Sequence, residues 1–286
     1  MLNMIRMDLY RLFRTKSMYV IWIIMTASIL LTTFLSKTDY EAIMEDNNMN
    51  QTTTLSDTSE DNSVENINIG MSVQLPTEPG EKVTVMDIFF ANSQGKFYAL
   101  FMVIFSVIFS TADISSDYIK NIAGQVSKRA MLIVSREVAL AVFTVITFAG
   151  AFALQIVFSR IAFGEILIGM EDNSLLYLLT QLVLHYAIVV ICMAAAVIVK
   201  NNVVSMIFAV CLTMNVMSIV YSGINNIVES LGVKNFQVYR YTVTGEIPLL
   251  IANPAIKECL MALGVAVVFI LVMTAAGSII FQKRDI

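Results

Sequence analysis

Few residues in this chain have the types and spacing that carry chemistry. The single histidine, His185, has no second imidazole with which to build a metal site. The three cysteines, Cys192, Cys211 and Cys259, fall in or at the edge of apolar runs, which indicates small packing residues instead of a disulfide framework or metal cluster. We therefore expect no metal site and no catalytic residue.

Nucleotide and hydrolase motifs are also missing from the sequence. There is no G-x-x-x-x-G-K-[ST] loop, so the chain cannot cradle ATP phosphates by itself. H-E-x-x-H and G-x-S-x-G are absent, which argues against an intramembrane protease or hydrolase. No basic tract is interleaved with aromatics, so nucleic acid is not an expected partner. The sequence predicts a chain that is not an enzyme and binds no cofactor.

His185 is still an ionisable group near the middle of an apolar stretch, a position that is functional by default. A neutral imidazole satisfied by Gln181, one helical turn earlier, or by a neighbouring helix is the simpler interpretation, because such groups usually join helices. A functional role for His185 stays open.

The elements that hold these residues follow from composition. Of the 286 residues, 57% are apolar and 14% are charged, which is typical of a chain that uses lipid as solvent. A helix needs about 20 apolar residues to cross a bilayer. Six windows free of Asp, Glu, Lys and Arg come near that length: 18–35, 97–112, 138–159, 174–199, 203–222 and 259–281. We expect an all-α polytopic membrane protein with six transmembrane helices in a single domain, 1–286.

Two windows need comment. The second is short, but the uncharged stretch 88–95 can lengthen it if Lys96 snorkels to the interface. The first is followed by no small-residue cleavage site, so it is interpreted as a retained anchor and not as a removed signal peptide.

Charge decides the orientation, because cytoplasmic loops carry an excess of Lys and Arg. Eleven of the 18 basic and 5 of the 22 acidic residues fall in four segments on one side: 1–17, 113–137, 200–202 and 282–286. The remaining 7 basic and 17 acidic residues fall in 36–96, 160–173 and 223–258. The sequence predicts a multi-pass protein of the cell membrane with both termini in the cytoplasm.

The first segment, 1–17, predicts an amphipathic helix in the headgroup plane. Its apolar stripe is Leu2, Ile5, Leu9, Leu12 and Phe13, with Arg11, Arg14 and Asn3 opposite, and Arg6 adds to the basic charge. Such a helix is attracted to anionic lipid. This helix anchors the first span, and it could in addition dock a partner; the two roles do not exclude each other.

The segment 113–137 is too polar for a span and too rich in helix formers for a simple turn. Ile114, Tyr118 and Ile122 share one helical face, and Gly124 marks a break before a second short helix. A short helix held between two spans can act as a lever, because a force on it moves both.

The same segment resembles the coupling segment of type-2 ATP-binding-cassette (ABC) exporter permeases. The matching positions are Asp113, Ile119-Lys120-Asn121, Ser127, Arg129 and Arg136. Those permeases usually have Gly where this chain has Asp117, so the local turn can differ. The layout of amphipathic start, six spans and two long external segments is similar over the whole chain.

The resemblance implies a permease half whose partners are cytoplasmic ABC ATPase subunits, which hold ATP and Mg²⁺, together with a second permease copy or a homologous permease and membrane lipids. It assigns ATPase coupling to Asp113, Asp117, Tyr118, Lys120, Asn121, Arg129 and Arg136. The lack of a large charged set in the spans favours an amphiphilic or hydrophobic cargo, such as a peptide antibiotic, lipid or drug. Mild polarity makes five residues possible pathway-lining groups, although helix packing explains them equally: Ser106, Ser110, Thr213, Asn215 and Ser218.

Two long segments lie on the predicted outer face. The first half of 36–96 is too acidic and polar to order itself, whereas apolar residues alternate with polar ones over 67–75 and again at Val83 and Val85. We expect a small extracellular β-hairpin there, which either caps the surface or gates a pathway. In the resembling permeases the position of 223–258 carries short external helices that dip into the bilayer; the residues alone show an interfacial aromatic cluster.

Two other functions stay open. A membrane-anchored sensor or accessory protein would bind an external ligand with its hairpin loop. An ion-coupled secondary transporter would commonly relay ions through carboxylates within its spans, and none of the six windows contains Asp or Glu.

Overall fold

The computed structural model describes residues 2–50, 75–77, 81–115, 130–233 and 236–283, and within these ranges the regular structure is helical. The elements in chain order are α1 (Leu2–Arg14), α2 (Lys16–Asn50), α3 (Val85–Gln94), α4 (Phe97–Ser115), α6 (Ala130–Phe163), α7 (Ser174–Val199), α8 (Asn202–Thr213), α9 (Met217–Ser230), η1 (Val238–Tyr241), α10 (Val243–Leu249) and α11 (Ile256–Gln282). The prediction of an all-α multi-pass membrane protein is confirmed at this level.

Among the described residues, four helices are long and apolar enough to cross a membrane: α2 over Lys16–Ala42, α6, α7 and α11. They correspond to predicted windows one, three, four and six, and α7 begins and ends where the fourth window does. α6 begins at Ala130, so it includes Arg136 and Glu137, both buried, which the charge-free window left out.

The other two predicted spans are bent helix pairs. α3 and α4 meet at 52°, and α8 and α9 meet at 66°, so the chain has up to six spans if each pair is one span. The second window gains length from α3, but Lys96 does not snorkel: its side chain is 2% exposed. That expectation was wrong because α8 packs on α4 and the Lys96 ammonium is bonded to Asn215, at the end of α8.

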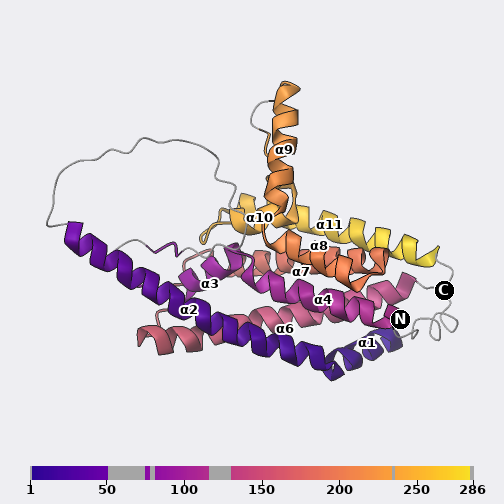
Figure 1. Ribbon diagram of the computed structural model, residues 1–286, viewed down its shortest axis with the longest axis horizontal. Coiled ribbons are helices and arrows are strands. Elements are labelled where there is room, and N and C mark those ends of the chain that lie inside the picture. Colours follow the sequence, from indigo (N-terminus) through magenta and orange to yellow (C-terminus); the bar gives the residue numbers. More distant parts are fainter. Residues whose placement is uncertain (1, 51–74, 78–80, 116–129, 234–235, 284–286) are drawn as a thin grey trace.

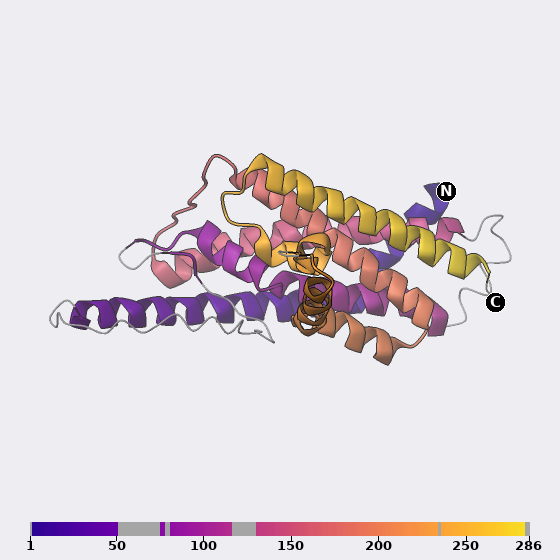
Figure 2. The ribbon, with the colours of Figure 1, turned by 90° about the horizontal axis from the view of Figure 1, so that it is seen from above.

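The helices form an elongated bundle with both termini at the same end (Figures 1 and 2). α7 lies at its centre, in contact with α4, α6, α8, α10 and α11. One apolar cluster joins α1, α2, α4, α6 and α7, and a second joins α4, α7, α8, α10 and α11. α9 projects sideways from the bundle, and none of its residues is buried (Figure 1).

The segment 36–96 contains more helix than expected. α2 continues to Asn50. Within α2, Lys37 and Glu41 lie one turn apart and form an ion pair (3.6 Å between Nζ and Oε1). The first arm and turn of the predicted hairpin fall mostly outside the described residues, and Val85, in the second arm, begins α3 instead. The hairpin is therefore not confirmed.

The segment 223–258 contains the end of α9, then η1 and α10, and then the start of α11. Short helices are thus present where the resemblance implied them. The side chains from Val243 to Ile247 in α10 are buried, and Gln181 of α7 donates a hydrogen bond to the Ile247 carbonyl (3.0 Å). α10 is a packed part of the bundle and not a surface loop.

Candidate coupling site

The N-terminal helix α1 is held against the bundle at the end where both termini lie. Its apolar contact is made by Leu12, which is fully buried, with Met4 and Leu9 packed against the same cluster. Thr15 separates α1 from α2, and its hydroxyl donates to the Arg11 carbonyl (2.8 Å). α1 is thus a separate helix with a face turned toward α4 and α6.

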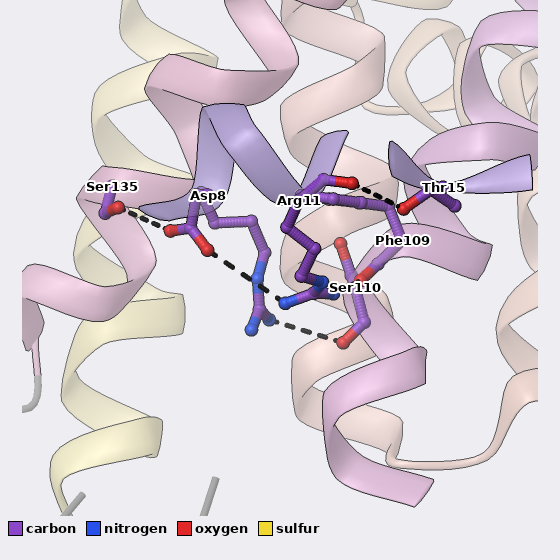
Figure 3. Close-up of polar contacts among 7 residues, drawn as sticks. Asp8, Arg11, Thr15, Phe109, Ser110 and Ser135 are labelled. Carbon is purple, nitrogen blue, oxygen red and sulfur yellow. Dashed lines mark hydrogen bonds and ion pairs between the residues drawn. The ribbon is translucent and has the colours of Figure 1, made fainter. Parts of the chain in front are cut away.

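The polar part of that face joins three elements (Figure 3). Asp8 is 3% exposed and accepts a hydrogen bond from the hydroxyl of Ser135, in the second turn of α6. Arg11 lies 4.0 Å from Asp8 and donates to the Phe109 carbonyl on α4 (2.8 Å). The Arg11 guanidinium also lies over the Phe109 ring, 4.5 Å from its centroid.

Arg136 adds a second contact between the helices on either side of the predicted lever. It is 4% exposed near the start of α6, and its guanidinium donates to the Ser110 carbonyl on α4 (3.3 Å). We call Asp8, Arg11, Ser135, Arg136 and the backbone of residues 109–110 the polar clamp. Charged hydrogen bonds of this kind are stronger than neutral ones, so the clamp holds α1, α4 and α6 in fixed register.

The clamp lies at the ends of α4 and α6 that are nearest in sequence to the predicted coupling segment. α4 ends at Ser115 and α6 begins at Ala130, so the clamp contacts both of the helices that border residues 116–129 in the sequence. A displacement of either helix end is transmitted to the other and to α1. The arrangement is suited to passing motion between α1, α4 and α6.

The structure gives positions for only some of the predicted coupling residues, and their role in coupling stays a prediction. Arg136 is placed in the clamp. Asp113 lies in the last turn of α4, although its side chain is outside the described residues. The others lie wholly outside them: Asp117, Tyr118, Lys120, Asn121 and Arg129.

The predicted faces of α1 need a correction. Arg6 and Arg14 are exposed as expected, and Arg14 donates to the Tyr10 hydroxyl (2.8 Å). Arg11, however, points at α4, whereas Leu2 of the apolar stripe is 81% exposed. The packed face of α1 thus contains both Leu12 of the apolar stripe and the Asp8–Arg11 pair.

The possible pathway-lining residues are distributed over two regions. Ser106 and Thr213 are buried; Ser106 donates to the Val189 carbonyl (3.0 Å), and Thr213 to carbonyls of its own helix. Ser110 belongs to the clamp through its carbonyl. Asn215 and Ser218 lie at the break between α8 and α9, where Ser218 donates to the Asn215 carbonyl (2.6 Å). Packing explains the first two, and the break is treated separately below.

His185 is completely buried, and its Nδ1 lies 2.8 Å from the Gln181 carbonyl, one turn earlier in α7. The simpler interpretation of this residue is confirmed for that nitrogen. The three cysteines are free thiols, and the described residues contain no group of three or more His, Cys, Asp or Glu side chains placed to hold a metal.

Sequence reasoning missed Asp8 and Ser135. A signal for Asp8 was available, because it is the sole acidic residue among the first 17 and lies three positions before Arg11. Ser135 carried no signal, since its partner lies 127 residues away.

Comparison with known proteins adds no assignment. No protein-family model matches the chain, and no curated protein matches it.

Proposed function

We propose that this chain is the membrane-spanning subunit of an ATP-driven exporter of the type-2 ABC class, and that it moves an amphiphilic or hydrophobic substrate out of the cell. ATP and Mg²⁺ would bind to a separate cytoplasmic ATPase. Two copies of the chain, or one copy and a homologous permease, would complete the transporter.

The observation that carries the proposal is the polar clamp. A coupling segment can move two spans together only if the helix ends beside it are firmly joined to each other. Asp8 and Arg136 join those ends to α1 and to each other through buried contacts. α1, the end of α4, the start of α6 and the end of α11 lie at one end of the bundle, which suits docking of an ATPase there (Figures 1 and 2).

In this mechanism the ATPase subunits close on binding ATP and push residues 113–137. The clamp passes the force to α4 and α6, which rotate against α7 and open the opposite end of the bundle. Asp8 keeps α1 in the same rigid group, so α1 moves with the two spans.

The first experiment asks whether an ATPase binds. The tagged protein is purified from its native membranes in mild detergent, and co-purifying chains are identified by mass spectrometry. We expect a soluble polypeptide with a phosphate-binding loop, and ATP hydrolysis in the eluate. Purification with no nucleotide-binding chain, under conditions that keep the protein monodisperse, would contradict the proposal.

The second experiment asks whether residues 113–137 couple the two proteins. Alanine at Lys120, Asn121 and Arg129 together should uncouple ATP hydrolysis from efflux of a fluorescent amphiphilic dye, while the protein remains inserted. Lys283→Ala is the matched control, because it removes a basic residue at the same end of the bundle but outside this segment. Unchanged efflux in the triple variant would count against coupling through this segment.

A further inference from the structure

Two helix breaks within the spans share an unusual backbone conformation. Lys96, between α3 and α4, has φ of 59°, and Asn215, between α8 and α9, has φ of 55°. Non-glycine residues adopt this left-handed conformation uncommonly, and Asn adopts it more readily than Lys. It interrupts the helix at both breaks.

The neighbour of each break is the other break. The Lys96 ammonium donates a hydrogen bond to the side-chain carbonyl of Asn215. In the part of the chain that the structure describes, the ion pairs do not include Lys96. The Asn215 amide is thus the polar side-chain partner of the Lys96 ammonium among the described residues.

A second tie lies beyond the breaks, because η1 and α10 contact both outer helices. α10 packs on α3, and η1 packs on α9 and α10. Three hydrogen bonds make the tie: Gln94 Nε2 to the Pro248 carbonyl (2.9 Å), the Val238 N–H to Asn225 Oδ1 (2.9 Å), and the Tyr221 hydroxyl with the Thr244 hydroxyl (2.5 Å). α3 and α9 are thus linked at the breaks and again through η1 and α10.

We propose that the Lys96–Asn215 contact joins the two helix breaks into one hinge unit, so that α9 does not swing away from the bundle without loosening α3. If α9 swung alone, a buried ammonium would lose its partner in apolar surroundings, which is strongly unfavourable. The unit is defined by this chain alone and does not require an ATPase, so it stands or falls separately from the proposed function.

The first test reads α9 after a change at the other break. Spin labels are placed at Ile227 on α9 and Leu271 on α11, both exposed, with the native cysteines replaced, and the protein is studied in lipid nanodiscs. Lys96→Met should broaden the Ile227–Leu271 distance distribution by about twofold or more, since α9 is released. Lys200→Met is the matched control: Lys200 has the same left-handed backbone (φ 57°) but lies exposed at the end of α7.

The reciprocal test reads α3 after a change at Asn215. Asn215→Gly keeps the left-handed backbone and removes the amide, and amide hydrogen exchange in residues 85–94 should become at least about tenfold faster. Asn215→Asp supplies a carboxylate to the ammonium and should slow exchange in the same residues. The two Asn215 variants test the same contact if Lys96→Met does not yield folded protein.

The outcomes separate clearly. Faster exchange in α3 after Asn215→Gly, with a broadened α9 distance after Lys96→Met but not after Lys200→Met, supports the shared hinge. An unchanged α3 in Asn215→Gly, or equal α9 distances in the two lysine variants, would overturn it.

Discussion

Replacing Asp8 by alanine tests the polar clamp most sharply. The side chain accepts a hydrogen bond from Ser135 and forms a long ion pair with Arg11, whose side chain is 22% exposed. A hydrogen bond to a charged group contributes about 1.5–3 kcal/mol, and a partly exposed ion pair at most about 1 kcal/mol. Loss of both should destabilise the docked position of α1 by about 2–4 kcal/mol, since Ser135 and Arg11 are also left without this partner.

Hydrogen exchange measures that loss directly. A free-energy change of about 2–4 kcal/mol corresponds to opening that is about 30 to several hundred times more frequent. Amides of α1 should exchange faster by that factor in Asp8→Ala, while those of α7 remain unchanged. Arg14→Ala is the control, because it removes an exposed charge from the same helix. If both variants raise the exchange rate of the α1 amides equally, Asp8 does not hold α1 against α4 and α6.

Three further predictions concern other parts of the fold. The single tryptophan, Trp22, donates to the Thr147 hydroxyl (3.0 Å), so Thr147→Val should shift its fluorescence to the blue and lower stability by about 0.6 kcal/mol. Gly169 has φ of 68°, and a Cβ there would overlap the Thr84 side chain, so Gly169→Ala should lower the melting temperature through about 1–2 kcal/mol of backbone strain plus that clash. Burial raises the pKa of Glu246 to about 7, so the folded state holds a proton that the unfolded chain releases above 4.5, and thermal stability should fall as pH rises through 7.

Each of these has a control. Thr26→Val removes a hydroxyl that donates to a carbonyl of its own helix, so it should leave the fluorescence maximum unchanged. Gly164→Ala meets no neighbour within 4 Å and should be milder than Gly169→Ala. Glu246→Gln should flatten the pH dependence of thermal stability. Besides burial, two neighbours act on the pKa of Glu246: Arg240 lowers it and Glu258 raises it. A red shift of Trp22 fluorescence in Thr147→Val would refute the first prediction. Equal melting temperatures for the two glycine variants would refute the second, and an unchanged pH dependence of thermal stability in Glu246→Gln would refute the third.

The spans were predictable because the membrane imposes a simple rule on composition. α7 lies between Asn173 and Lys200 in the sequence, so the uncharged window and the helix coincide. α6 was underestimated because the same rule excludes charged residues, whereas Arg136 and Glu137 are buried in its second turn and beyond. A charge-free window finds the middle of a span and misses ends whose charges have partners.

The breaks and the clamp were not predictable in the same way. Lys96 and Asn215 are 119 residues apart, and Asp8 and Ser135 are 127 residues apart, so neither contact leaves a local pattern. α3 did leave one: Thr84 and Asp87 form a capping box, which marks the start of a helix where alternation of Val83 and Val85 suggested a strand. The local cap decided the structure because it satisfies backbone groups that a lone strand would expose.

The proposed function requires the end of the bundle that carries α1 and the polar clamp to face the cytoplasm, where an ATPase can reach residues 113–137. Single cysteines at Arg6 and at Glu81, both exposed in the structure, mark the two ends in a protein without native cysteines. In intact cells a membrane-impermeant maleimide should label the cysteine at position 81 and reach the one at position 6 only after the cells are opened. Labelling of position 6 in intact cells, with position 81 protected, would place the clamp outside the cell and contradict the proposed orientation.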